Sequence, residues 1–240
     1  MRLACQLRPT KDIAIIPLLP PQVGASFVHS KSRTHPGEER YVVSMFVDMR
    51  GSTQMAADQL PFDTVFIVNR FLEAVSLAVT QAGGKVNQYL GDGLLALFGV
   101  ETDRRSACRQ ALRAAAMIAG NIKHLNRGLA EAERSPLRYG IGINGGEVIL
   151  GDVGSGENTM FTVLGDAVNV AARLQEMTKD LECQVVVSEE VYKVAGLPED
   201  GPPVLEIVIR GHATPMVVRT VAEAERLATM MATATSLVAE

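Results

Sequence analysis

Residues 41–53 read Tyr-Val-Val-Ser-Met-Phe-Val-Asp-Met-Arg-Gly-Ser-Thr, an apolar run that stops at an acid and is followed by small polar residues. The β-branched and aromatic content of the run predicts a buried strand ending at Asp48, then a turn into a helix. Burying a carboxylate is unfavourable unless it is paired, so a divalent metal is a candidate partner for Asp48. The glycine and hydroxyl residues that follow can offer backbone N–H groups to a phosphate. An ordinary strand end has the same pattern, so this stretch alone leaves both interpretations open.

A second stretch, residues 83–99, predicts two strands joined by a tight turn at Gly91-Asp92-Gly93. Aspartate is favoured in such turns, which is the structural interpretation of Asp92. If these strands pair with the first one, however, Asp48 and Asp92 meet. Two neighbouring carboxylates repel each other, and a magnesium ion that bridges them to substrate phosphates relieves the repulsion.

A third stretch, residues 161–174, reads Phe-Thr-Val-Leu-Gly-Asp-Ala-Val-Asn-Val-Ala-Ala-Arg-Leu and follows a glycine-rich strand at 145–154. On a helix, Asn169 and Arg173 are four residues apart and share one face. That face presents an amide and a guanidinium together. Arginine is well suited to gripping phosphate because its charge does not titrate.

In this order, the three stretches resemble the catalytic domain of class III nucleotidyl cyclases, the adenylate and guanylate cyclase family. The resemblance covers roughly residues 40–220, and three ordered motifs are far more specific than any one of them. It implies an α/β fold, an α+β sandwich with a ferredoxin-like βαββαβ core and extra C-terminal elements, paired head to tail in a homodimer. Strands and helices in this mixed order also favour a sandwich with an antiparallel sheet.

The resemblance further implies a reaction in which the 3′-hydroxyl of ATP attacks its own α-phosphorus and pyrophosphate leaves. Asp48 and Asp92 would hold two Mg²⁺ or Mn²⁺ ions with the Met49 carbonyl, Asn169 would position the ribose, and Arg173 would stabilise the transition state. The predicted phosphate contacts are the backbone of Arg50, Gly51, Ser52 and Thr53, together with Arg138, Arg210 and His212. His212 occupies the place after Gly211 where the family often has a lysine, and Arg210 precedes that glycine. For Arg138 the alternative interpretation is a surface arginine at the start of a strand.

Base recognition is where the sequence departs from the family. Adenylate cyclases usually carry a lysine four residues before the second metal acid, and Gln88 stands there in this chain, with Thr162 at the second base-reading place. Alternation puts Gln88 and Gly84, not Lys85, on one strand face. Both an amide and a hydroxyl can donate or accept, so ATP is favoured but a GTP or relaxed preference stays open.

In this family one subunit supplies the metal acids and the other supplies the base-reading, amide and guanidinium groups. This chain carries both sets, so we expect a homodimer with two equivalent sites and an inactive monomer. A different class of function is a non-catalytic pseudo-cyclase that binds nucleotide or only dimerises. The presence of both acids with Asn169 and Arg173 argues against it, whereas Gln88 and His212 argue mildly for it.

The composition of the chain excludes some classes of function. Among 240 residues, 47% are hydrophobic and the formal net charge is −4, which suits a packed domain and argues against a nucleic-acid-binding protein. Three scattered cysteines predict a reducing compartment, the cytoplasm, and no disulfide framework. No apolar run approaches the roughly 20 residues of a membrane span.

The N-terminal part does not resemble the start of a cyclase domain. Residues 1–21, with Cys5 in a Leu-Ala-Cys-Gln context, resemble the last segment of a [2Fe–2S] ferredoxin, and residues 22–39 are typical of a linker. The other three cluster ligands are absent, so we expect no Fe–S cluster in this chain. We expect the chain to be the C-terminal part of a longer ferredoxin–cyclase protein; the alternative is a leader with an incidental cysteine.

The remaining expectations concern secondary structure between and after the motifs. A helix from Leu60 to Gly83 is predicted to bury Val65, Val68, Leu72, Val75 and Val79, and a second helix over 103–126 has a small-residue face that includes a buried Cys108. Strands are expected at 137–143 and 147–153 around a Gly145-Gly146 turn, and at 185–187, where Ser188 caps a short helix. A hairpin over 204–220 around Gly211 and a helical tail at 221–240 complete the chain, with residues 40–220 as the catalytic domain.

Overall fold

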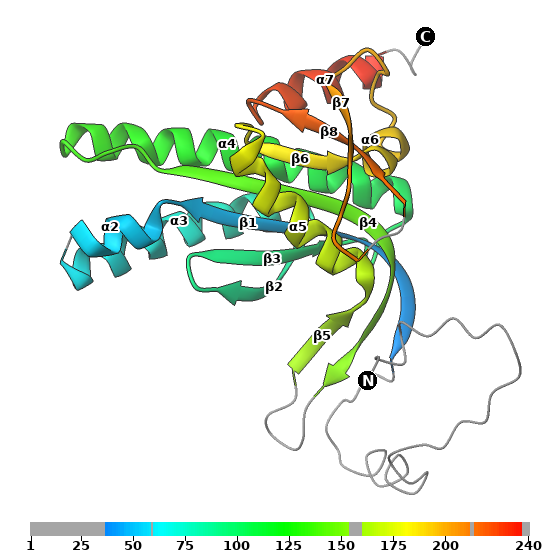
Figure 1. Cartoon of the computed structure of the whole chain (residues 1–240), viewed down its shortest axis with the longest axis horizontal. Coiled ribbons are helices and arrows are strands. Elements are labelled where there is room, and N and C mark those ends of the chain that lie inside the picture. The colour runs from blue at the N-terminus through cyan, green and yellow to red at the C-terminus, as the bar shows by residue number, and fades with distance from the viewer. Residues whose placement is uncertain (1–36, 59, 154–159, 212–213, 237–240) are drawn as a thin grey trace, which may run out of the picture.

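In the computed structural model, which describes residues 37–58, 60–153, 160–211 and 214–236, one sheet organises the chain (Figure 1). Its strands are β1 (Glu38–Arg50), β2 (Lys85–Leu90), β3 (Gly93–Phe98), β4 (Arg138–Val153), β5 (Met160–Leu164), β6 (Val185–Ser188), β7 (Val204–Ile207) and β8 (Met216–Val221). The helices are α2 (Ser52–Asp58), α3 (Pro61–Gln81), α4 (Arg104–Glu131), α5 (Asp166–Asp180), α6 (Glu189–Val194) and α7 (Arg226–Ser236).

The strand order is β2-β3-β1-β4-β6-β8-β7, with β5 paired to β4 beside this path. All of these pairings are antiparallel except β4 with β6, which is parallel. The first four strands with α3 and α4 form the βαββαβ unit, in the order β2-β3-β1-β4 of a ferredoxin-like sheet. The predicted α+β sandwich is therefore confirmed.

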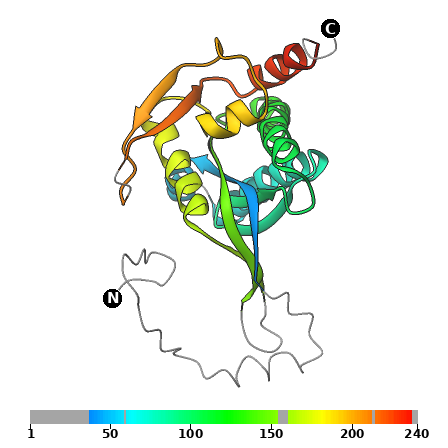
Figure 2. The same cartoon turned by 90° about the vertical axis from the view of Figure 1, so that its right-hand side faces the viewer.

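Helices cover both faces of the sheet (Figure 2). The larger buried cluster lies between the sheet and α3, α4, α6 and α7, and includes Val43, Met45 and Val47 of β1. On the opposite face α5 packs over β4, and a second cluster there includes Leu95, Leu97 and Val168. Alternate residues of β1 thus face two different layers, which leaves Asp48 on the α5 face.

The strand β4 corrects one prediction. The expected turn at Gly145-Gly146 is wrong, because β4 runs without a break from Arg138 to Val153 and pairs with β1 from Arg138 to Leu150. A Cβ on Gly145 would lie 2.1 Å from the Tyr41 hydroxyl, and one on Gly146 would lie 2.7 Å from Ala167 Cβ. The two glycines therefore serve close packing across a strand, which the sequence pattern does not distinguish from a turn.

The helix α3 begins at Pro61, as predicted, and four of the five predicted residues face the core: Val75 and Val79 are fully buried, and Val68 and Leu72 pack partly buried against it. Its buried residues are Ile67, Phe71, Val75, Ala78 and Val79, whereas Val65 is 58% exposed. The prediction is therefore wrong only for Val65, and the buried face extends instead to Ile67 and Phe71, because the helix is apolar on more than one side.

The helix α4 confirms the predicted small-residue face and the buried Cys108. Its start is fixed by Asp103, whose Oδ1 accepts hydrogen bonds from the backbone N–H groups of Arg105 and Ser106 at 2.9 and 3.0 Å. The helix continues to Glu131, five residues past the predicted end. Leu125 and Leu129 extend its apolar face over the core there.

Close packing of α5 on β4 gives a prediction for Gly142. A Cβ on this residue would lie 2.2 Å from both the Ala171 carbonyl oxygen and the Gln175 backbone nitrogen. Because a helix backbone cannot move aside as a side chain can, we expect Gly142→Ala to lower the free energy of unfolding by about 3 kcal/mol. Urea denaturation measures this change.

The control for Gly142 is Gly120 in α4, where a Cβ would meet nothing within 4 Å. Gly120→Ala should stabilise the protein by about 0.5–1 kcal/mol, because alanine has the better helix propensity. Equal effects of the two substitutions would contradict the proposed packing of α5 on β4.

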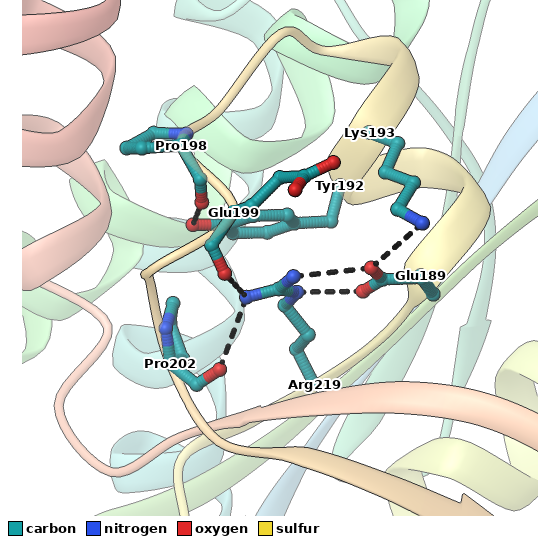
Figure 3. Close-up of polar contacts among 7 residues, drawn as sticks. All are labelled: Glu189, Tyr192, Lys193, Pro198, Glu199, Pro202 and Arg219. Carbon is teal, nitrogen blue, oxygen red and sulfur yellow. Dashed lines mark hydrogen bonds and ion pairs between the residues drawn. The ribbon is translucent and has the colours of Figure 1, made fainter.

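A buried ion-pair network holds the C-terminal elements together (Figure 3). Arg219 of β8, only 3% exposed, makes a two-point contact with Glu189 at 2.6 and 3.0 Å and donates to the carbonyls of Glu199 and Pro202. Its guanidinium also lies 4.3 Å from the centre of the Tyr192 ring. The network thereby ties the segment before β7 to α6.

At the start of α6, Ser188 occupies the predicted N-cap position, but no side-chain cap hydrogen bond forms. The buried Ser188 Oγ finds no partner within the described part of the chain. The predicted capping interaction of Ser188 is therefore wrong, and the neighbouring Glu189–Arg219 pair holds the first turn of α6 instead.

The Arg219 network predicts a pH-dependent stability. Hydrogen bonding to Arg219 lowers the pKa of Glu189 below its ordinary value of 4.5. A carboxyl whose pKa is lower in the folded state stabilises the fold above that ordinary value, and the stabilisation is lost as the pH falls through the folded pKa. We therefore expect Glu189→Gln to lower the free energy of unfolding by about 2 kcal/mol at neutral pH, with the difference from wild type shrinking as the pH falls below 4.5.

Urea denaturation across this pH range measures the effect. The control is Glu101→Gln, because Glu101 pairs with Lys85 on the surface and is 74% exposed, so little change is expected at any pH. A Glu189→Gln defect of the same size at every pH would show that the lost contact is not the ion pair.

The predicted C-terminal helix forms as α7 and packs on α4, with Leu227 fully buried. The predicted hairpin of β7 and β8 is also confirmed, with Gly211 at φ +97° in its loop. None of the helices within the described ranges combines the length and apolar character needed to cross a membrane. The predictions for residues 1–21 and for most of the linker lie outside the described residues, and the domain boundaries stay predictions.

Candidate functional site

Two carboxylates meet where β1 passes the β2–β3 turn. Asp48 pairs in register with Gly93, so Asp92 in the turn lies next to Asp48's direct cross-strand partner. The strand β1 continues to Arg50, two residues past the predicted end, which places Asp48 inside the ladder. Burial, and then the charge of Asp92, raise the pKa of the Asp48 carboxyl to about 6, against a hydrogen bond from the Met49 backbone that lowers it.

Gly93 leaves room for the Asp48 side chain. A Cβ at this position would lie 2.6 Å from both Asp48 Oδ1 and the Val47 carbonyl oxygen. A half-buried carboxylate that a second carboxylate destabilises is a suitable ligand for a divalent cation, which would relieve both effects. The residues present therefore fit the predicted metal ions, although no further histidine, cysteine or acid joins the pair within the described ranges.

The predicted Met49 ligand concerns its backbone only. The Met49 side chain is 3% exposed and belongs to the core under α3 and α4, on the face opposite Asp48. Its carbonyl as a metal ligand stays a prediction.

The predicted phosphate loop, residues 50–53, follows Asp48 directly. Gly51 has φ +76°, which favours glycine, and a Cβ there would meet nothing within 4 Å, so the turn is open. The Arg50 guanidinium is engaged elsewhere, because Nη2 donates to the carbonyls of Thr178 and Cys183 at 2.7 and 2.6 Å. The Arg50 side chain is therefore not available for the predicted phosphate binding. The backbone of residues 50–53 and the side chains of Ser52 and Thr53 remain as candidates.

Arg138 lies near the same loop. It is the cross-strand partner of Arg50 and therefore shares the sheet face that carries Asp48, two residues further along β1. Its exposed side chain lines a cavity of about 500 Å³ together with Arg50, Lys123 and Glu182. Arg138, a predicted phosphate contact, therefore lies at the same end of the sheet as Asp48 and Asp92.

Asn169 and Arg173 lie on the exposed face of α5, one turn apart, while Ala171 and Leu174 pack beneath them. Asp48 lies beside the C-terminal end of α5. Its cross-strand partner on β4 is Gly140, and a Cβ on Gly140 would lie 2.1 Å from the hydroxyl of Thr178. Asn169 precedes Thr178 by nine residues, about 13 Å along the helix at 1.5 Å per residue. The Arg173 guanidinium pairs with Glu176 at 2.8 Å. Asn169 therefore lies along α5 away from the acidic pair of its own chain, and the Arg173 guanidinium is engaged by Glu176.

The predicted base-recognition positions, Gln88 and Thr162, lie on β2 and β5. A β-bulge at Asn87 breaks the alternation of β2, since Val86 pairs with Ala96 and Gln88 with Leu95. Lys85, which pairs with Leu97, therefore shares a face with Gln88, and the prediction that excluded it is wrong. The companion prediction for Gly84 is also wrong, because a Cβ there would meet the Phe98 ring on the opposite face.

The Lys85 ammonium forms a surface ion pair with Glu101 at 2.5 Å. Gln88 is exposed, and the half-buried Thr162 pairs with Gly151 at the outer edge of β4. Arg210 lies exposed in the β7–β8 connection, and His212 lies outside the described residues.

The chain is similar to several known proteins. The family model of the adenylate and guanylate cyclase catalytic domain matches residues 36–211. An adenylate cyclase of Anabaena cylindrica is 34% identical over 164 residues, which cover 67% of this chain and 32% of that protein. An uncharacterised protein of Mycobacterium tuberculosis is 34% identical over 182 residues, 75% of this chain and 32% of that protein. The chain thus spans about a third of the length of these curated relatives.

Solved structures show the same fold. The crystal structure of the guanylyl cyclase Cya2 superposes with a TM-score of 0.70 at 26% identity, covering 78% of this chain and 94% of that one. The adenylyl cyclase CyaB from P. aeruginosa superposes with a TM-score of 0.65 at 22% identity, covering 78% and 96%.

Proposed function

The chain belongs to the adenylate and guanylate cyclase catalytic domain family, and from this membership we propose that it converts ATP to 3′,5′-cyclic AMP and pyrophosphate at a site shared by two copies of itself. The observation that carries the proposal is the acidic pair. Asp48 is half-buried beside Asp92, its pKa is raised, and Gly93 keeps its side chain uncrowded. A purely structural sheet gains nothing from two carboxylates that repel each other in this way.

In the proposed reaction the ribose 3′-oxygen forms a bond to the α-phosphorus, the bond from that phosphorus to the β-phosphate oxygen breaks, and the hydroxyl proton passes to solvent. Asp48 and Asp92, with the Met49 carbonyl, would hold two Mg²⁺ or Mn²⁺ ions, which when bound activate the hydroxyl and neutralise charge on the leaving pyrophosphate. The backbone of residues 50–53 and the Arg138 side chain would bind the triphosphate.

Asn169 and Arg173 would act on the nucleotide held by a second copy of the chain. Their place on the exposed face of α5 supports this division, because it presents both side chains outward. Asn169 would orient the ribose, and Arg173 would balance the charge that develops on the α-phosphoryl group. The paired strands β4 and β5 also expose Ile149, Val153 and Leu164, each about half exposed, and such a patch suits self-association.

The preference for ATP is the finer part of the proposal. The preference rests on the absence of the acid that guanylate cyclases commonly carry at these two places, since Gln88 and Thr162 can each satisfy either base. The three cysteines are scattered, and the described ones, Cys108 and Cys183, are buried and unpaired, which supports a cytoplasmic location.

A competition assay tests the proposed function. The purified chain is incubated with equal amounts of ATP and GTP and with Mg²⁺ or Mn²⁺, and the products are separated by chromatography. We expect cyclic AMP to predominate. Predominant cyclic GMP would establish a guanylate cyclase, and bound nucleotide without product would establish a non-catalytic module.

A further inference from the structure

The inference concerns the bulged residue Asn87. It has no partner on β3, because the ladder steps from Val86–Ala96 to Gln88–Leu95 around it. Its side chain instead crosses to another strand, where Nδ2 donates a hydrogen bond of 3.2 Å to the Phe161 carbonyl. The bond joins residues 74 positions apart in the sequence.

This bond connects the two strands that carry the base-recognition positions. Asn87 directly precedes Gln88, and Phe161 directly precedes Thr162. Within the described ranges β2 pairs only with β3, and β5 only with β4. The backbone ladders therefore link Gln88 to Thr162 only by way of β3, β1 and β4, whereas Asn87 links them directly.

The spacing of these two side chains matters because their chemistry does not select a base. Adenine offers an acceptor at N1 and a donor at N6, and guanine offers the reverse at N1 and O6. A glutamine amide and a threonine hydroxyl can each satisfy either pattern. Discrimination must then come from where the two groups are held, since a mispositioned donor leaves a polar group unpaired.

We propose that Asn87 is a positioning residue that fixes the separation of Gln88 and Thr162 and thereby sets the adenine-to-guanine selectivity of the site. This inference rests on the proposed cyclase function. The β-bulge also contributes to this positioning. As the extra residue, Asn87 points out of the β2–β3 ladder, and Gln88 after it lies on the same face as its partner Leu95.

The test uses Asn87→Asp, which keeps the size of the side chain but replaces the donor by an acceptor that repels the Phe161 carbonyl. The measured quantity is the ratio of kcat/KM for ATP to kcat/KM for GTP. We expect this ratio to move toward one by about tenfold. Losing the hydrogen bond to Phe161 lets Gln88 and Thr162 shift, and this lowers kcat/KM more for the base that fits the original spacing better. Asn87→Ala should give the same direction without the added repulsion.

The matched control is Ser76→Ala. The Ser76 hydroxyl bonds the Tyr89 hydroxyl at 3.2 Å, so it also anchors β2, but to α3 and not to β5. This control should leave the ratio unchanged. Hydrogen exchange adds a readout that does not depend on catalysis, because Asn87→Asp should raise the exchange rate of amides 161–164 by roughly threefold or more while Ser76→Ala does not.

The outcomes are distinguishable. An active wild type whose selectivity ratio survives Asn87→Asp, or whose two kcat/KM values fall equally, would overturn the inference alone. A wild type that cyclises both bases equally would also overturn it, since no selectivity would need positioning. A wild type without any cyclic product would overturn the proposed function, and this inference with it.

Discussion

Asp48→Asn is expected to lower the rate of cyclic nucleotide formation by about a thousandfold or more, because it removes a charged ligand from the proposed metal site. The measurement is the initial rate at saturating nucleotide and metal. The same substitution should not destabilise the metal-free protein. The pKa of Asp48 is raised in the fold to about 6, so its ionised form opposes folding at higher pH.

In the presence of a chelator we therefore expect Asp48→Asn to have a Tm equal to or above that of wild type at pH 8, with the difference shrinking near pH 5. Asp63→Asn is the control, since Asp63 makes a partly exposed ion pair with Arg134 at 3.5 Å and should affect neither activity nor metal dependence. Activity of Asp48→Asn within a few-fold of wild type would refute the metal assignment.

Mixing two inactive variants is expected to restore activity. In a dimer of one Asp48→Asn and one Arg173→Ala subunit, one site combines both defects and the other combines the intact acids with an intact arginine. Random exchange makes half of the dimers mixed, so the expected activity is about a quarter of wild type. The measurement is the rate after co-refolding or prolonged mixing, compared with each variant alone.

The control mixture is Asp48→Asn with Asp92→Asn. Both substitutions damage the acid half of a site, so no mixed dimer has an intact site and no activity should return. Restoration in this control, or its absence in the first mixture, would refute the assignment of the acids and Arg173 to different subunits.

The parts of the fold that could be predicted from the sequence depend on residues close together in the chain. The hairpin at Gly91-Asp92-Gly93, the start of α3 at Pro61 and the small-residue face of α4 follow from turn chemistry and periodicity, and all three form. The Gly145-Gly146 prediction failed because glycine marks both turns and close packing. What decides between them is Tyr41, a partner about a hundred residues away.

The candidate site shows the same limit. The pairing of Asp48 with the Asp92 turn could be anticipated from two strand ends, and the register of β1 and β3 bears it out. The bulge at Asn87 could not, because no residue in Lys85–Leu90 marks an insertion; the signal is a hydrogen bond to a distant strand. The sequence also does not show that Arg50 donates to the carbonyls of Thr178 in α5 and of Cys183 just after it, because every residue has a backbone carbonyl.

The long ribbon of β1 and β4 has a mechanical consequence. The described chain enters β1 at Glu38, which lies opposite Leu150, and Leu150 lies opposite Val163 of β5. Asp48 is ten residues further along β1, about 33 Å away at the usual rise per residue. A displacement at Glu38 therefore passes through only two strand pairings, Glu38 with Leu150 and Leu150 with Val163, before it reaches the neighbour of Thr162. To reach Asp48 it must pass along the length of β1. If the proposed assignment holds, such a displacement would alter the proposed base-recognition positions before the proposed metal ligands.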